Sequence, residues 1–188
     1  MVEQILHDVA AADDQFAYAA LRYFNVAGCA ADGTLGEDHR PETHLVPLLL
    51  QAASHLGEQV TIFGTDHPTP DGTCIRDYIH VEDLVDAHVL ASEALVASKP
   101  LIYNLGIGRG HSVKQVVDAA GRVTGADIRV QIGSRRAGDP PVLYANADKI
   151  RRELGWEARI TNIDRIVDTA WQWLRSHQNG YGDNGSVR

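Results

Sequence analysis

Cysteine is scarce in this sequence: only Cys29 and Cys74 occur among its 188 residues. They lie far apart and neither belongs to a CxxC pair, so the sequence excludes a disulfide framework and a cysteine-based zinc knuckle. We therefore expect two reduced thiols.

Long apolar runs are also missing. The most apolar stretch, Leu45 to Ala53, is interrupted by Pro47 and Gln51, and it is shorter than the roughly 18 to 20 residues of a membrane span. The opening residues, Met1 to Gln4, include an acid and lack the positive region that begins a secretory signal. The sequence predicts no membrane segment and a cytoplasmic location.

Basic residues are fewer than acidic ones, 17 against 25, which gives a formal net charge of -8. This balance argues against a nucleic-acid partner, because duplex binding usually needs a net basic face. Arg135 and Arg136 are a local exception that would suit a small anion site, although paired loop arginines more often face solvent or carboxylates. The nine histidines show no HExxH or other clustered ligand spacing, so we expect no metal site.

Familiar cofactor and catalytic motifs are absent as well. The segment from Gly106 to Gly110 suggests a dinucleotide-binding loop, but His111 stands where the third fingerprint glycine belongs. The next expected strand, Ile128 to Ile132, carries no carboxylate that would hold a ribose. There is no P-loop and no GxSxG elbow either. A tight turn explains the glycines more simply.

Apolar residues alternate between helical and strand-like spacing along the chain, which favours an α/β fold. We expect helices over Met1 to Ala12, Leu45 to His55, Glu82 to Ala97, from Ser112 with a capping box to Gln115, from Asn146 to Gly155, and from Thr161 onward. We expect strands over Phe16 to Phe24, Val60 to Phe63, Leu101 to Leu105 and Ile128 to Ile132. Turn-forming residues predict loops over Asn25 to Gly28 and Thr65 to Thr73.

Two of these elements carry more specific expectations. The strand Phe16 to Phe24 is apolar on both faces, like an interior strand of a parallel sheet. The helix Glu82 to Ala97 is expected to bury one stripe, made of Leu84, Val85, His88, Val89 and Leu95.

The first expected helix has no visible start. Val2, Ile5, Leu6 and Val9 form an apolar stripe, yet no Ser, Thr, Asp or Asn precedes it to accept from the free backbone N–H groups. The pattern predicts that the sequence starts inside a helix.

Three stretches together carry a family resemblance. They are Leu21 to Gly28 (LRYFNVAG), Asp71 to Val81 (DGTCIRDYIHV) and Arg135 to Asp139 (RRAGD). They resemble the UDP-glucose 4-epimerases, a family of the extended short-chain dehydrogenase group, over nearly all of residues 1–177. The opening segment is similar to the part of the family helix that follows the catalytic YxxxK motif.

The resemblance implies an α/β fold with part of an NAD-binding, doubly wound (Rossmann-like) sheet and a smaller α/β substrate-binding domain. Residues 1–28 would be a remnant of the NAD-binding domain. Residues 29–177 would mainly form the UDP-sugar-binding domain, with about 80–105 returning to the Rossmann-like sheet. Residues 178–188 are expected to be a flexible tail.

The resemblance also assigns binding residues. The positions that would contact the UDP-sugar are Asn25, Leu45, Phe63, Arg76, Tyr78, Val113, Arg136 and Asp139, and Tyr23 would face the nicotinamide end of NAD. Guanidinium groups suit a diphosphate, and an aromatic face suits uracil. For Leu45, Phe63 and Val113, a place in the core is as good an explanation.

The family interconverts UDP-glucose and UDP-galactose in galactose metabolism, with bound NAD and a YxxxK tyrosine, and its members are commonly homodimers. This sequence contains neither a glycine-rich NAD loop nor that tyrosine and lysine, so we expect a truncated isomerase without catalytic residues, inactive by itself. We also expect poor solubility, because the strand Phe16 to Phe24 would lie at an edge.

Two alternatives stay open: a non-catalytic UDP-sugar-binding module, and a related nucleotide-sugar dehydratase or decarboxylase. The sequence also departs from some family members at His44 and Leu143. These departures leave the acceptance of N-acetylated sugars undetermined.

Overall fold

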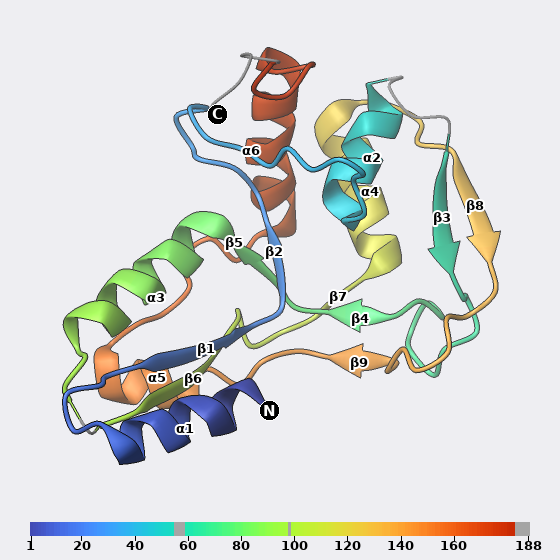
Figure 1. Cartoon of the computed structure of the whole chain (residues 1–188). Helices are drawn as coiled ribbons and strands as arrows, with labels where there is room; N and C mark the ends of the chain where they lie inside the picture. Colours follow the sequence, from blue (N-terminus) through green and yellow to red (C-terminus); the bar gives the residue numbers. More distant parts are fainter. Residues whose placement is uncertain (55–58, 98, 183–188) are drawn as a thin grey trace.

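The computed structural model describes residues 1–54, 59–97 and 99–182, and it contains both helices and strands (Figure 1). The helices are α1 (Val2–Ala12), α2 (Leu45–Ala53), α3 (Val81–Glu93), α4 (Val113–Thr124), α5 (Asp148–Leu154) and α6 (Ile163–Ser176). The strands are β1 (Ala19–Tyr23), β2 (Asn25–Ala27), β3 (Val60–Phe63), β4 (Ile75–Arg76), β5 (Tyr78–His80), β6 (Leu101–Leu105), β7 (His111–Ser112), β8 (Val130–Gly133) and β9 (Val142–Leu143). The α/β class expected from the sequence is confirmed.

Most strand pairs are parallel. Strand β1 pairs with β6, β2 with β5, and β3 with β8, all in parallel. Strand β4 lies between β7, which is antiparallel to it, and β9, which is parallel. Because parallel neighbours need long crossovers, segments far apart in the sequence meet at the ends of these short strands.

Two apolar cores form around these strands. In one, helices α2, α4 and α6 pack against one another, with Leu49, Val116 and Ile166 fully buried (Figure 1). In the other, α3 and α5 pack on β6, with Ile79, Leu105 and Ile150 at the centre. The second core unites segments 79–105 and 147–158, so α5 packs beside β6 and not among the other carboxyl-terminal helices. The division of the chain into an NAD-binding remnant and a UDP-sugar-binding domain remains a proposal.

The first strand differs from the sequence expectation. Strand β1 ends at Tyr23, and Asn25–Ala27 forms strand β2 where we expected a loop. Residues of β1 are partly or largely exposed, and β6 is its one partner in the described part of the chain. The apolar run Phe16 to Phe24 is typical of a buried strand, but β1 lies at a sheet edge in the described part of the chain, as expected, so its side chains stay partly exposed.

Helix α3 buries a different face from the one predicted. Leu84, Ala87 and Ala91 are buried, whereas Val85 and Val89 are 53% and 49% exposed. Two overlapping stripes, at three- and four-residue spacing, both fit the sequence of this helix. The stripe that contains Ala87 and Ala91 is the buried one, because these small side chains allow α3 to pack closely on β6. The predicted stripe was therefore wrong apart from Leu84.

The helix ends follow local capping chemistry. Ser112 and Gln115 form the expected capping box of α4. Helix α6 starts later than expected, since Asn162 is its cap and accepts from the backbone of Asp164 and Arg165. Asn146 accepts from Asp148 N, although the geometric cap of α5 is Ala147. Helix α1 has no side-chain cap at Met1, as its sequence indicated.

The described part of the expected tail, residues 178–182, is held by contacts. The Tyr181 ring lies 5.5 Å from that of Trp173 (centroids), its N–H donates to Asp38, and its hydroxyl bonds to Gly36. These contacts tie residues 178–182 to α6 and to the loop before α2, and residues 183–188 of the expected tail lie outside the described chain. Among the described helices, none has the length and apolar character needed to cross a bilayer.

Candidate functional site: a nucleotide-sized cavity

A cavity of about 1110 Å³ opens where several of these strands and helices end. Its volume slightly exceeds the range of about 300 to 1,000 Å³ that is typical of small-molecule sites. All nine residues assigned from the family resemblance line its wall: Tyr23, Asn25, Leu45, Phe63, Arg76, Tyr78, Val113, Arg136 and Asp139. Residues spread over more than a hundred sequence positions are therefore brought together.

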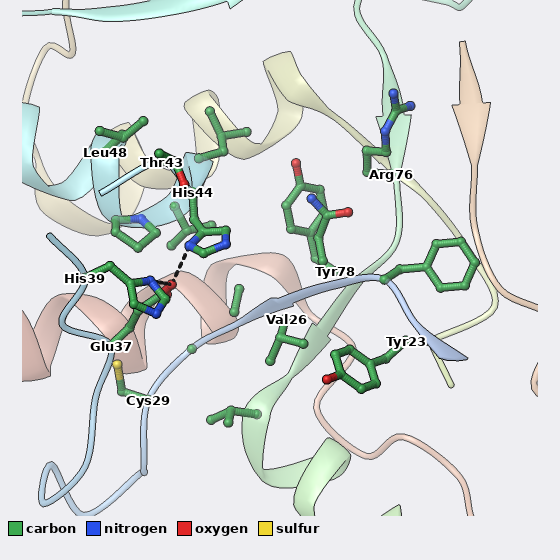
Figure 2. A pocket seen from close by; sticks show the side chains of 18 of the residues that line it. Tyr23, Val26, Cys29, Glu37, His39, Thr43, His44, Leu48, Arg76 and Tyr78 are labelled. Atoms are coloured by element: carbon green, nitrogen blue, oxygen red, sulfur yellow. Dashed lines mark ion pairs between the residues drawn. The ribbon is translucent and has the colours of Figure 1, made fainter. Parts of the chain in front are cut away.

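The strand pairing explains this convergence. Asn25 pairs with Tyr78 in the register of β2 and β5, and Phe63 closes β3 beside Gly133 of β8. Leu45 and Val113 are the first residues of α2 and α4. Figure 2 shows Tyr23 of β1, Tyr78 of β5 and Arg76 of β4 among the side chains that line the cavity.

Two arginines share one carboxylate in this cavity. Arg136 Nε lies 2.9 Å from Asp139 Oδ2, and Arg76 Nη2 lies 3.8 Å from Asp139 Oδ1. Arg76 Nη1 also donates to the carbonyls of Ile75 and Pro140, which fixes this largely buried guanidinium. Two cations face one anion here, so the cluster carries a net positive charge suited to an anionic ligand.

The aromatic wall is covered by one of these arginines. The guanidinium carbon of Arg136 lies 5.0 Å from the centroid of the Phe63 ring, a cation–π distance. A flat heterocycle can stack on this face of Phe63 only after the Arg136 side chain moves aside.

The other predicted residues differ in exposure. Tyr78 is buried in the helical core, and burial raises its pKa to about 12. Tyr23 is half exposed, with its ring 6.0 Å from that of His88. Of the two positions that depart from some family members, His44 lines the cavity, while Leu143 pairs with Arg76 in β9.

The glycine-rich segment has a structural role that sequence reasoning missed. The fully buried carboxylate of Asp77 accepts from the backbone N–H groups of Ile107, Gly108 and Ala145. A Cβ at Gly106 would lie 2.4 Å from Asp77 Oδ2, so only glycine fits this turn. Burial raises the pKa of Asp77, and this effect outweighs the three hydrogen bonds, which lower the pKa. The segment Gly106 to Gly110 therefore encloses a protein carboxylate and offers no phosphate loop for NAD.

A histidine cluster at the edge of the cavity was also missed. His39 and His44 lie beside Glu37 and Glu42, whose spacing in the sequence, two Glu-x-His units, was the available signal. Burial and the neighbouring Glu42 carboxylate raise the pKa of Glu37.

The residues present do not supply the hydride chemistry of an epimerase. No tyrosine in the sequence is followed four positions later by lysine. The one GxGxxG pattern, Gly180 to Gly185, follows helix α6, whereas a dinucleotide-binding loop follows a strand and opens a helix. Tyr23 is the single residue assigned to the cofactor. The tyrosine–lysine pair of the family is therefore absent from this sequence, whereas the residues that the resemblance assigns to the UDP-sugar line the cavity.

Comparison with known proteins identifies relatives of this arrangement. Residues 1–106 match the model of the NAD dependent epimerase/dehydratase family. The UDP-glucose 4-epimerase of Lacticaseibacillus casei is 48% identical over 185 residues, which cover 97% of this chain and 55% of that protein. UDP-arabinose 4-epimerase 1 of Arabidopsis thaliana is 45% identical over 186 residues, covering 97% of this chain and 44% of that protein.

A solved structure agrees with the fold. UDP-glucose 4-epimerase from Bifidobacterium longum, in complex with NAD+ and UDP, superposes with a TM-score of 0.89 at 40% identity, covering 95% of this chain and 53% of that chain. This chain spans about half the length of the relatives it matches. The matched residues exceed half of the chain, and the chain therefore belongs to the NAD dependent epimerase/dehydratase family.

Proposed function

We propose that this chain provides the UDP-sugar-binding part of a UDP-glucose 4-epimerase. The observation that carries the proposal is the convergence of the family-assigned residues on one cavity of suitable size. The cavity wall combines two guanidinium groups, one carboxylate and an aromatic ring. These are the groups that a diphosphate, a ribose and a pyrimidine respectively require.

The diphosphate would replace Asp139 as the partner of the arginines. Its oxygens match the donor fork of Arg136 and Arg76 better than a single shared carboxylate does. Asp139, released from Arg136, would then accept from ribose hydroxyls. The same movement uncovers the ring of Phe63, so the uracil would stack where the guanidinium now lies.

The sugar would lie toward Asn25 and Tyr23, with Leu45, Tyr78 and Val113 completing the wall. NAD, when bound to a complete enzyme of this family, takes up and returns a hydride. This chain's residues do not hold its phosphates, and no tyrosine–lysine pair takes the hydroxyl proton. We therefore propose binding without turnover by this chain alone.

The same proposal covers the identity of the sugar and the cellular location of the protein. Relatives of nearly equal identity act on UDP-glucose and on UDP-arabinose, so the shared uridine diphosphate is the recognised group. We place the protein in the cytoplasm, in galactose metabolism, and expect homodimers of the complete enzyme. The domain division suggested by the resemblance is retained with α5 assigned to the β6 core.

Calorimetric titration with UDP tests the assignment of the arginines. We expect the chain to bind UDP. The Arg136→Ala substitution should weaken the free energy of UDP binding by about 1.5 to 3 kcal/mol, because charge-assisted hydrogen bonds to the diphosphate are lost. Arg135→Ala is the matched control, because Arg135 pairs with Asp66 and does not line the cavity. Equal UDP affinity of the Arg136→Ala variant and the parent chain would refute the proposal.

A further inference from the structure

The loop before α2 concentrates two carboxylates and two imidazoles. The ligand atoms of Glu37, His39, Glu42 and His44 all lie within 4.8 Å of one another. His44 Nδ1 lies 2.7 Å from Glu37 Oε1 and 3.1 Å from Glu42 Oε1. Figure 2 shows the rings of His39 and His44 directed toward the Glu37 carboxylate, with the ion pairs drawn as dashed lines. One small volume thus holds four donor atoms.

The distances between these ligand atoms are close to those around a tetrahedrally coordinated metal ion. With Zn–N and Zn–O bonds of about 2.0 to 2.2 Å, neighbouring ligand atoms in a tetrahedral site lie about 3.4 Å apart. The His39 Nδ1 distances to Glu37 Oε1 and Glu42 Oε2 are 3.1 and 3.9 Å. Together with the His44 distances, these values bracket the tetrahedral spacing. All four ligand atoms lie within 4.8 Å of one another, so binding of one ion would require the more distant of them to move closer together.

Charge and accessibility agree with this geometry. Two carboxylates balance the charge of one divalent cation, which also removes their mutual repulsion. The Glu42 side chain is only 6% exposed and is fixed, because its Oε1 accepts from the backbone N–H groups of Thr43 and His44. The two histidine side chains are about half exposed, so an ion can reach them from solvent.

The donor set selects the class of metal. Two imidazole nitrogens with two carboxylate oxygens suit zinc and its transition-metal neighbours, whereas calcium and magnesium prefer oxygen ligands alone. We propose that Glu37, His39, Glu42 and His44 form a binding site for a divalent zinc-class ion. Three of them also line the cavity, so the ion would fix the loop beside Leu45.

Zinc titration of the purified chain, stripped of metal with a chelator and kept reduced, tests this site. We expect one equivalent of Zn2+ to bind, with no comparable binding of Ca2+ or Mg2+. Glu37→Gln and Glu42→Gln should each weaken Zn2+ affinity at least tenfold, because ligand loss exceeds the effect of removing outer-shell partners. His7→Gln is the control, since His7 forms an exposed pair with Asp8 far from this loop in sequence.

The glutamate variants decide the outcome. They keep the shape of the side chain, and glutamine at position 42 can still accept from Thr43 and His44 N–H, so the loop is preserved. Far-ultraviolet circular dichroism checks that each variant keeps the parent fold. Unchanged Zn2+ affinity in both variants would overturn the proposal. Sulfur-to-metal charge-transfer absorption on Co2+ addition would also overturn it, because it would place the ion on Cys29 or Cys74.

Discussion

At the residue scale, three positions far apart in the sequence meet at one point: Gly28, His80 and Thr169. His80 Nε2 lies 3.0 Å from Thr169 Oγ1, and its Nδ1 accepts from the N–H of Glu82. A Cβ at Gly28 would lie 2.4 Å from the His80 ring, and the φ of Gly28 is +85°. These residues come from the segments that carry the family resemblance and from α6, so part of those motifs serves packing.

The buried imidazole predicts a pH-dependent stability. Burial lowers the pKa of His80, so the unfolded chain binds a proton near pH 6.5, the usual imidazole value, before the folded chain does. The corresponding stability is present above that pH and is lost as the pH falls below it, by up to about 1.4 kcal/mol per unit. Urea unfolding between pH 8 and 5.5 measures this slope.

The variant comparison isolates His80 from other titrating groups. His111 contributes in the same direction, because burial lowers its pKa too. His80→Gln should therefore flatten the slope without abolishing it, while His7→Gln, at an exposed position, should leave it unchanged. A slope equal to that of the parent chain in His80→Gln would show that His80 does not resist protonation.

At the residue scale, the sequence identified residues that line one cavity, but it did not predict the contacts among them. Arg76, Arg136 and Asp139 were assigned from motifs, and all line the cavity. Their mutual ion pairs, and the position of Arg136 over Phe63, were not predictable because they depend on where β3, β4 and the loop after β8 meet.

At the element scale, spacing placed most helices and strands but did not select the buried face. Strands β3 and β6 have the predicted bounds, and the capping box of α4 is present. Helix α3 was placed with the wrong face inward, because its sequence carries two overlapping apolar stripes and only packing on β6 chooses between them.

Two neighbouring positions of α3, Leu84 and Val85, test which face of this helix is buried. Leu84 is 7% exposed and belongs to the core with β6, so Leu84→Ala should cost about 2 to 5 kcal/mol of unfolding free energy. Val85 is 53% exposed, so Val85→Ala should change stability by less than about 0.5 kcal/mol. Chemical denaturation measures both. Equal losses of unfolding free energy in the two variants would show that Val85 is buried like Leu84, as the stripe predicted from the sequence requires.

At the scale of the whole molecule, parallel pairing and two cores bring segments between Tyr23 and Arg159 to one cavity. Apolar side chains of α1 and α3 remain exposed, including Ile5, Val85 and Val89, and β1 pairs with β6 alone among described strands. Such surfaces favour association. We expect the purified chain to self-associate, which ultracentrifugation over a concentration series measures; a monomer at every concentration would contradict this.

We propose that this chain holds a UDP-sugar site but lacks the tyrosine–lysine pair that epimerisation requires in this family. One NMR experiment addresses both parts: saturation transfer from the chain to UDP-glucose, with NAD present, followed over hours. We predict transfer to the uracil protons, because the base would stack on Phe63, and no growth of UDP-galactose signals, because no tyrosine–lysine pair occurs in the sequence. Absence of saturation transfer would show that the chain has no UDP-sugar site, and formation of UDP-galactose above a buffer control would show that it catalyses epimerisation by itself.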